Sequence, residues 1–288
     1  MRPLRIRLQE ARRRLGVPWE VLERDYLLSW ILAGIDRVPA LGGKLVFKGG
    51  TALRKCYFGD YRFSEDLDFS GRNGTPAGDA MEVLVHAACA AGERMLAEYA
   101  PVAINCERYV ERNPHPRGQE AFSIRAQLPW QNRPHTRVMI EVTVDEPNFR
   151  PVESRRVIHE YGEPFDMHIP VYALEEVVAE KLRAILQQAA LVKVRGWARS
   201  RARDYYDLWR ILGEYGQQMD LTEFDVLLRE KCSVRQVSFD GPDDFFHESI
   251  LADVDRTWEQ WLGPLVSGLP SFETVLRSLK PRVMDLIE

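Results

Sequence analysis

The spacing of the apolar residues changes once along this chain, near residue 165, and that change limits the folds open to it. Before this point apolar residues come in short runs and in alternation, as in "KLVF" and "TRVMIEVTV", which indicates β-strands. From Ala173 onward they recur at helical spacing, as in "ALEEVVAEKLRAILQQA". The 288 residues suffice for two modest domains. We therefore predict an α+β protein, with an α/β domain over residues 1–165 and a helical domain over residues 166–288.

Individual elements can be predicted in both parts. Helices are expected over residues 18–38, where Pro18 precedes apolar residues at helical spacing, and over residues 76–100. The strand "KLVF" runs into two glycines, after which Thr51 can cap a short helix, "ALRKCYF". Strand-like stretches lie around "VAINCERYV", "AFSIRAQLPW" and "TRVMIEVTV", and a later helix over "ARSRARDYYDLWRILGEYG".

The stretch "YRFSEDLDFS", residues 61–70, has the pattern of a buried strand but contains acidic residues. Alternation places Asp66 and Asp68 on one face, roughly 7 Å apart at Cα, with Ser64 on the same face if the strand extends that far. From this separation both carboxylates can reach one divalent ion or bridge two ions. The alternative is a half-exposed strand with its polar face in water. Because Asp is depleted in strands and like charges repel, we favour the metal site.

A second unusual stretch, "FKGGTALRK", combines a strand end, two glycines, a hydroxyl and a helix start. This arrangement lets backbone amides approach an anion at the positive end of a helix. By itself a Gly-Gly pair before a helix is more often a plain turn, and the spacing is not that of a Walker loop. The acidic strand that follows favours a phosphate site. The candidate nucleotide ligands are Lys48, Gly49, Gly50, Thr51 and Ser64.

Composition excludes several classes of protein. The four cysteines stand far apart without a C-x-x-C pair, so neither a zinc site nor a disulfide framework is indicated, and a reducing cytoplasm fits. No stretch approaches the roughly 18 apolar residues that span a bilayer, so we expect a cytoplasmic protein without a membrane partner. The net charge is −4, yet arginines crowd into "RPLRIRLQEARRR", "RSRARD" and the run from Arg108 to Arg137. Such blocks are either solvated faces or patches that hold a phosphate backbone.

Together, "FKGGTALRKCYFGDYRFSEDLDFS" resembles the AbiEii/AbiGii toxin family. A Gly-Gly-Ser/Thr turn, a short helix and a D-x-D strand mark the nucleotidyltransferase superfold that this family shares with DNA polymerase β. The similarity runs from about residue 20 to about residue 215. It implies a nucleotidyltransferase-type mixed sheet flanked by helices, two Mg²⁺ ions, and transfer of a nucleoside monophosphate from an NTP to RNA, with the tRNA 3′ end as the best-known acceptor. It further implies a toxin whose antitoxin is encoded nearby.

The resemblance extends to two helical motifs in the second part of the chain. In "EEVVAEKLRAIL", Lys181 is expected to neutralise nucleotide phosphate charge, and in "RARDYYDLWRIL", Asp204 is expected to orient a neighbouring catalytic group, for which Lys181 is a candidate. Without the resemblance, Lys181 would be read as a surface lysine and Asp204 as an ion-pair partner. The predicted catalytic residues are therefore Asp66, Asp68, Lys181 and Asp204.

Polymerase-type sites also use a third carboxylate from a neighbouring strand. In "TRVMIEVTVDEP", Glu141 and Asp145 fall on one face by alternation, so both are candidates. We choose Glu141 because it lies between two apolar residues in mid-strand, whereas Asp145 near the strand end suits a turn. The predicted metal ligands are Asp66, Asp68 and Glu141.

Two other functions remain open from the sequence. An enzyme with the same core can attach a nucleotide to a small hydroxyl compound such as an aminoglycoside, although the arginine blocks argue against an acidic acceptor pocket. The chain can also be a non-catalytic RNA-binding module, but binding alone gives no use for the aspartate pair.

Overall fold

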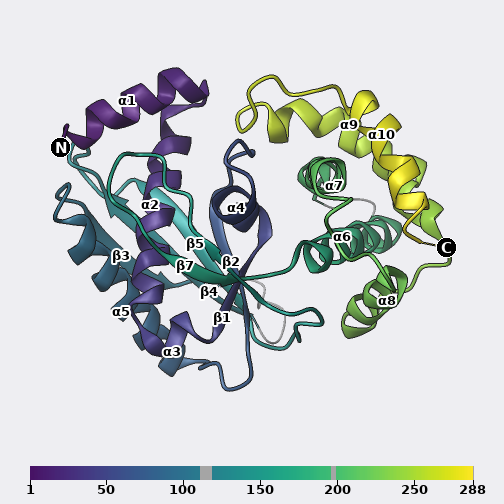
Figure 1. The fold of residues 1–288 in the computed structure, drawn as a ribbon, viewed down its shortest axis with the longest axis horizontal. Coiled ribbons are helices and arrows are strands. Elements are labelled where there is room, and N and C mark those ends of the chain that lie inside the picture. Colours follow the sequence, from purple (N-terminus) through teal and green to yellow (C-terminus); the bar gives the residue numbers. More distant parts are fainter. Residues whose placement is uncertain (111–118, 196–198, 288) are drawn as a thin grey trace. The chain divides into compact units, whose positions relative to one another are not determined.

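The computed structural model describes residues 1–110, 119–195 and 199–287, without the side chains of residues 193 and 194. The chain divides into two compact units, Met1–Tyr172 and Ala173–Glu288 (Figure 1). The first unit continues past residue 165 because strand β7 (His168–Val171) pairs with β1 (Leu45–Lys48). The last strand of the sheet thus comes directly before the helical part of the chain.

The first unit is built on a seven-stranded sheet in the order β3-β4-β5-β2-β1-β7-β6. Parallel pairing joins β1 to β7 and β2 to β5, and the other pairs are antiparallel. The prediction of a mixed sheet is confirmed. The remaining strands are β2 (Asp66–Gly71), β3 (Ala103–Arg108), β4 (Gln119–Gln127), β5 (Thr136–Thr143) and β6 (Glu153–Arg156).

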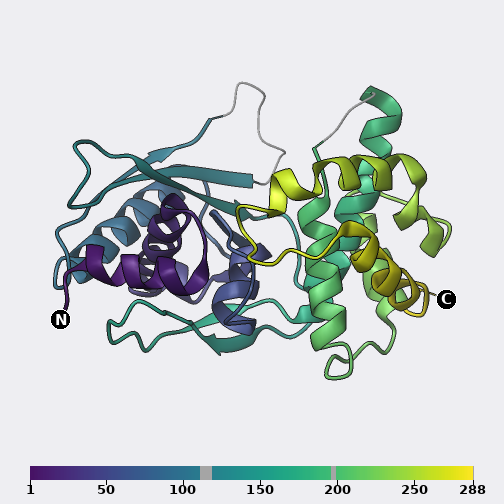
Figure 2. The ribbon, with the colours of Figure 1, turned by 90° about the horizontal axis from the view of Figure 1, so that it is seen from above.

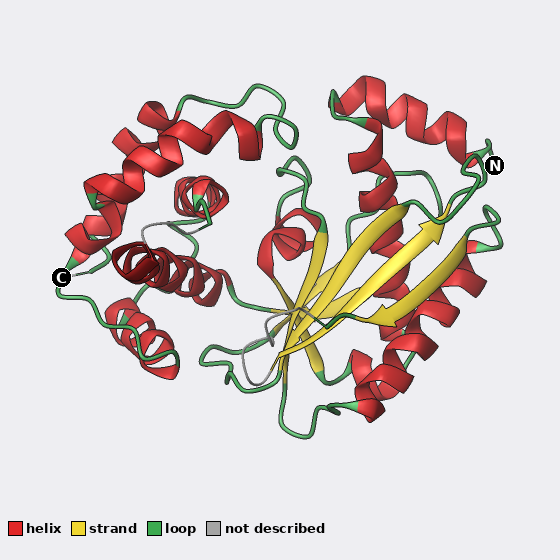
Figure 3. Ribbon diagram, turned by 180° about the vertical axis from the view of Figure 1, so that it is seen from behind, coloured by secondary structure: helices red, strands yellow, loops and turns green. Residues whose placement is uncertain are grey.

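Two long helices, α2 (Trp19–Asp36) and α5 (Asp79–Leu96), cover one face of this sheet, and in Figure 3 the strands lie in front of them. The helix backbones approach each other closely at two glycines. A Cβ on Gly34 would lie 2.1 Å from the carbonyl oxygen of Ala88, and a Cβ on Gly92 would lie 2.6 Å from that of Trp30. No larger residue fits at either position unless the helices move apart.

The other face of the sheet carries the alternate residues of four strands, and we call it the open face. Along β3 its residues are exposed, whereas Ile104 and Cys106, which point toward α5, are buried. The same alternation buries Leu67 and Phe69 on the helix-covered side of β2. The open face includes Asp66 and Asp68 of β2, Arg137, Met139 and Glu141 of β5, Ala121, Ser123 and Arg125 of β4, and Ala103, Asn105 and Glu107 of β3.

Shorter helices complete the first unit. Helix α1 (Leu4–Leu15) precedes α2, and α3 (Pro39–Gly42) precedes β1. Between β1 and β2 the chain forms α4 (Gly49–Ala52) and continues as a π-helical turn, η1 (Leu53–Tyr57).

The second unit is helical throughout its described residues (Figure 2). Its helices are α6 (Leu174–Arg195), α7 (Ala202–Glu214), α8 (Phe224–Val234), the 3-10 turn η2 (Pro242–Phe246), α9 (Glu248–Leu262) and α10 (Phe272–Met284). Tyr205 and Phe245 are fully buried in its core, and the Tyr205 hydroxyl donates to the Phe245 carbonyl. The predicted helical part is confirmed, although α7 begins at Ala202 and residue 198 lies outside the described residues.

Several local expectations are corrected by the structure. The acidic strand begins at Asp66, and residues 61–65 form an irregular segment because the buried side chains there come in succession and do not alternate. Thr51 lies inside α4 and is not its N-cap, a position that Lys48 occupies without a side-chain cap. Helix α1 and strands β6 and β7 were not predicted. In the described part of the chain, no helix is both long and apolar enough to cross a membrane.

Candidate active site

The two aspartates of the acidic strand lie together on the open face, as alternation predicts. In the parallel pairing of β2 with β5, Asp68 stands directly opposite Glu141, and Asp66 stands opposite Met139. Glu141 is therefore a cross-strand neighbour of the pair, and all three carboxylates are half-buried. Asp145, the other candidate, lies beyond the end of β5 in a bend.

The glycine turn lies directly against one of these carboxylates. Gly49 has a φ of 77°, a left-handed conformation that favours glycine, and a Cβ on it would lie 2.3 Å from Oδ2 of Asp68. Lys48, the residue before it, is paired with Asp68 across β1 and β2. Strand register and backbone conformation thus bring the predicted phosphate turn and the predicted metal ligand into contact.

The rest of the turn contacts the segment that leads into the acidic strand. The Thr51 hydroxyl donates to the backbone carbonyl of Asp66, which fixes α4 against the start of β2. A Cβ on Gly50 would lie 2.5 Å from Nη2 of Arg62, so a guanidinium lies against the second glycine. Arg62 is buried, and its Nη1 donates to the Phe63 carbonyl at 3.1 Å. Arg62 was not predicted, because its only signal in the sequence is its place just before the acidic strand.

Ser64 lies before the acidic strand and not within it. Ser64 is buried but precedes the strand, which begins at Asp66. The alternation that would place its hydroxyl beside the aspartates therefore does not apply.

The three carboxylates do not enclose a metal site by themselves. Within residues 1–110, 119–195 and 199–287, no three or more His, Cys, Asp or Glu side chains are arranged to hold a metal ion by themselves. Asp66, Asp68 and Glu141 therefore do not form a complete protein cage. Such a set still suits Mg²⁺, which is commonly bound by one or two carboxylates together with water and the phosphates of the substrate.

Lys181 and Asp204, the predicted residues of the helical unit, form an ion cluster between α6 and α7. The Lys181 ammonium lies 3.1 Å from Oδ1 of Asp204 and 2.5 Å from Oδ2 of Asp207. Asp204 also pairs with Arg201 at 3.3 Å. The Asp207 side chain is completely buried. Asp207 was therefore missed as the closer partner of Lys181, although its spacing of three from Asp204 puts both on one helix face.

A buried polar cluster anchors the helical turn that follows the glycines. In η1, Lys55 lies 2.7 Å from Oδ2 of Asp25 on α2, and Nε of Arg54 lies 3.2 Å from Oδ1. The Tyr161 hydroxyl donates to the same carboxylate at 2.7 Å. Burial by itself raises the pKa of the Asp25 carboxyl, but the charges of Lys55 and Arg54 outweigh it and lower this pKa from 3.8 to about 2.

Two arginines of the N-terminal block form ion pairs that stabilise the first unit. Arg7 is buried and lies 2.5 Å from Glu163, and it donates to the Tyr161 carbonyl at 2.6 Å. Arg14 pairs with Glu160 at 3.1 Å. These two arginines join α1 to the segment before β7. The residues 111–118 of the Arg108–Arg137 run lie outside the described residues.

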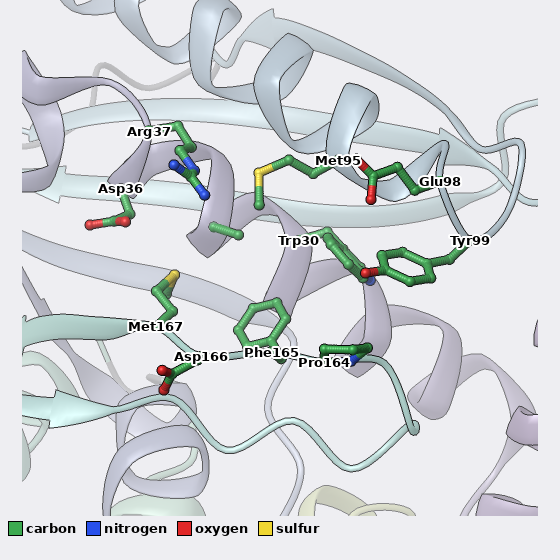
Figure 4. Close-up of a pocket in the computed structure, with 11 residues that line it drawn as sticks. Trp30, Asp36, Arg37, Met95, Glu98, Tyr99, Pro164, Phe165, Asp166 and Met167 are labelled. Atoms are coloured by element: carbon green, nitrogen blue, oxygen red, sulfur yellow. The ribbon is translucent and has the colours of Figure 1, made fainter. Parts of the chain in front are cut away.

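A hollow of about 270 Å³ lies on the helix-covered side of the first unit (Figure 4). The C-terminal ends of α2 and α5 and the segment before β7 line it, with Trp30, Tyr99 and Phe165 among the side chains. The Trp30 ring lies 5.4 Å from that of Tyr99 and 5.5 Å from that of Phe165. None of the predicted site residues lines this hollow.

Comparison with known proteins identifies the family. The solved structure of MenT4, a nucleotidyltransferase toxin from Mycobacterium tuberculosis H37Rv, aligns with a TM-score of 0.64 and 21% identity over 97% of this chain and 89% of that one. This likeness shows a shared fold. No curated protein matches the sequence. The family model of the AbiEii nucleotidyl transferase toxins of type IV toxin–antitoxin systems matches residues 30–278. The chain therefore belongs to the AbiEii toxin family, and by that membership it is an NTP-dependent nucleotidyltransferase.

Proposed function

We propose that this toxin transfers a nucleoside monophosphate from an NTP to RNA, and that the 3′ end of a tRNA is the acceptor. The observation that carries the proposal is the contact between Gly49 and the Asp68 carboxylate on the open face. It brings a turn suited to phosphate and a residue suited to Mg²⁺ together at one place. Family membership removes the alternative of a non-catalytic RNA-binding module.

In this proposal, Asp66 and Asp68 hold Mg²⁺ with Glu141 beside them, and the phosphates of the NTP complete the coordination. When bound, the metal lowers the pKa of the attacking hydroxyl and stabilises charge on the α-phosphate and the departing pyrophosphate. The amides at Gly49 and Gly50 and the Arg62 guanidinium lying against Gly50 attract the triphosphate. Lys181 supplies further positive charge, and Asp204 holds its ammonium in one orientation.

The RNA acceptor is supported by arginines that are exposed on the open face. Arg125 and Arg137 are both exposed on the open face, where the catalytic carboxylates also lie. Exposed arginines suit a phosphate backbone better than a small cationic acceptor such as an aminoglycoside. We further propose a cytoplasmic location and a cognate antitoxin as protein partner.

The test measures the transfer of label from each of the four α-labelled NTPs to bulk tRNA, with and without Mg²⁺. We expect labelled tRNA only with Mg²⁺, and no labelling by the Asp68→Ala variant. Removal of the tRNA 3′ terminal nucleotides before the reaction tests the position of transfer. Labelling of an added aminoglycoside in place of tRNA would support the small-molecule enzyme instead, and labelling of tRNA without divalent ion would contradict the metal assignment.

A further inference from the structure

The open face carries two arginines that pairing in the sheet does not explain. Arg125 of β4 and Arg137 of β5 are directly opposite in the antiparallel register, and both are exposed. Like charges directly opposite each other on neighbouring strands destabilise a sheet. Among the described residues, neither arginine forms an ion pair with a carboxylate, although Asp66 of β2 lies diagonal to Arg137 and the exposed Glu107 of β3 lies diagonal to Arg125. Ion pairing within the described chain therefore does not account for this pair of positive charges.

One of the two arginines is held in a defined orientation. Nε of Arg137 donates to the Ser123 hydroxyl at 3.0 Å, and its Nη2 lies 3.3 Å from the sulfur of Met139. The guanidinium also lies 5.7 Å from the ring centroid of Tyr109. The side chain thus lies along the sheet over β5 and β4, which leaves the guanidinium partly fixed before any ligand binds.

This orientation brings the guanidinium to the row of Ser123 and Met139, which Asp66 continues across the sheet. The backbone amide of Tyr109 donates to the carbonyl of Ala121, and Ala121 is the register partner of Glu141. Tyr109, Glu141 and Asp68 therefore lie in one row across the sheet. Along β5, Arg137 precedes Glu141 by four residues, or roughly 13 Å, which a few nucleotides of single-stranded RNA can span.

We infer that the outer part of the open face binds the single-stranded 3′ segment of the RNA acceptor, with Arg125 and Arg137 on its phosphates and the Tyr109 ring against a base. This inference rests on the proposed function, which supplies an RNA acceptor at the carboxylates. The occupant is a nucleic acid because two adjacent, exposed arginines match a phosphate backbone, and because aromatic rings stack on bases. The RNA segment runs from the two arginines to Asp66 and Asp68, where its terminal hydroxyl receives the nucleotide.

The experiment measures transfer to bulk tRNA at increasing tRNA concentration and saturating NTP, with the full-length protein. The test protein carries Arg125→Ala and Arg137→Ala together. The matched control is Arg94→Ala, which removes an exposed arginine from α5 on the helix-covered side. We expect the KM for tRNA to rise at least tenfold in the double variant, with the KM for NTP unchanged and kcat at saturating tRNA nearly preserved.

Salt dependence separates phosphate binding from a structural role. The slope of log KM for tRNA against log salt should fall by about 1.4 in the double variant, because each lost contact to single-stranded phosphate removes about 0.7. Arg125→Lys with Arg137→Lys should restore most of the affinity, since lysine still provides the charge. The Tm of the double alanine variant should equal or exceed that of the wild type.

Each other outcome overturns the inference in a distinguishable way. If the wild type labels tRNA but the double variant keeps the KM of the Arg94→Ala control, the RNA takes another path and the proposed function stands. If the KM stays unchanged while inhibition by the antitoxin is lost, the face binds a protein. A lowered Tm with an unchanged salt slope makes the arginine pair structural. If the wild type labels no RNA, the proposed function fails first, and this inference fails with it.

Discussion

The aspartates that matter in this chain fall into two groups with opposite surroundings. Asp66 and Asp68 are half-buried on the open face, and Asp68 lies directly against the glycine turn. Asp25 and Asp207 are buried, and each is in contact with a lysine, Lys55 for the former and Lys181 for the latter. The first group lies on a face that solvent reaches, where the proposed function places the chemistry, whereas the second group is enclosed together with a lysine. Burial, and not residue type, thus separates the proposed site from ion pairs that stabilise the fold.

The largest expected effect comes from the open-face pair. Asp66→Ala and Asp68→Ala should each lower transfer at least about 1000-fold, since loss of a metal ligand removes several kcal/mol of transition-state stabilisation. The Tm should be unchanged or slightly higher than that of the wild type, because one of two like charges on a face is removed. Transfer kinetics and Tm are measured on the same preparations. Wild-type turnover in either variant would end the metal assignment.

Substitution of Lys181, the partner of the buried Asp207, should lower both transfer activity and stability. Lys181→Ala leaves the buried Asp207 without its lysine, which should cost about 3–5 kcal/mol of unfolding free energy. In the proposed function Lys181 neutralises nucleotide phosphate charge, so we expect transfer to fall about 100-fold as well. Lys181→Arg should recover stability but not full transfer, since arginine does not replace lysine at a close contact.

A matched control separates these two effects. Lys231 on α8 is fully buried and lies 2.7 Å from Glu176 and 3.2 Å from Glu180. Lys231→Ala should lose similar stability, measured by urea unfolding, yet keep transfer at a temperature where the protein is folded. Equal transfer in the Lys181→Ala and Lys231→Ala variants would show that Lys181, like Lys231, has only a structural role.

The glycine turn offers a smaller and more local perturbation. Gly49→Ala places a methyl group within 2.3 Å of the Asp68 carboxylate and should displace it. We expect transfer to fall up to about 100-fold, since small displacements at a reacting centre have effects of this size. Gly78→Ala is the control, because Gly78 has a φ of 57° but open space around its Cβ position. Both variants should lose about 1–2 kcal/mol of stability, and only Gly49→Ala should lose activity.

The smallest effect concerns pH. The pKa of the Asp25 carboxyl is lowered from 3.8 to about 2, so its stabilisation is fully present above pH 3.8 and is lost as the pH falls through 2. This amounts to about 2 kcal/mol. Urea unfolding of the wild type and of Asp25→Asn should therefore give free energies that converge by that amount between pH 5 and pH 2. A constant difference between them would show that Asp25 is not held as a charged partner of Lys55.

The sequence predicts the open-face pair better than the buried group, for a physical reason. Strand alternation alone puts Asp66 and Asp68 on one face, and it holds wherever the strand runs. That Asp68 meets Glu141 depends on the pairing of β2 with β5, two strands far apart in the chain. Likewise, the contact of Lys181 with Asp207 depends on how α6 packs on α7, which no local pattern reveals.

The errors also have local causes. Ser64 was assigned to the strand because "YRFSEDLDFS" has the composition of one, but strand pairing begins at Asp66. Strands β6 and β7 have four residues each, too few to show a period, and β6 is the charged sequence "ESRR". Helix α1 has arginines on most of its surface and lacks a wide apolar stripe. Such elements depend on pairing and packing with other parts of the chain, which the local sequence does not show.

The close contact of α2 with α5 at Gly34 and Gly92 makes both glycines intolerant of substitution. A side chain at either position meets backbone and not a movable side chain, so neighbouring rotamers cannot relieve the clash. In a saturation screen for loss of toxicity, these two glycines should score with Asp66 and Asp68 as positions where almost every substitution is inactivating. Soluble yield would separate them, because the glycine variants fail to accumulate as folded protein while the aspartate variants do. A tolerance map alone would therefore mark the helix crossing as a second active site.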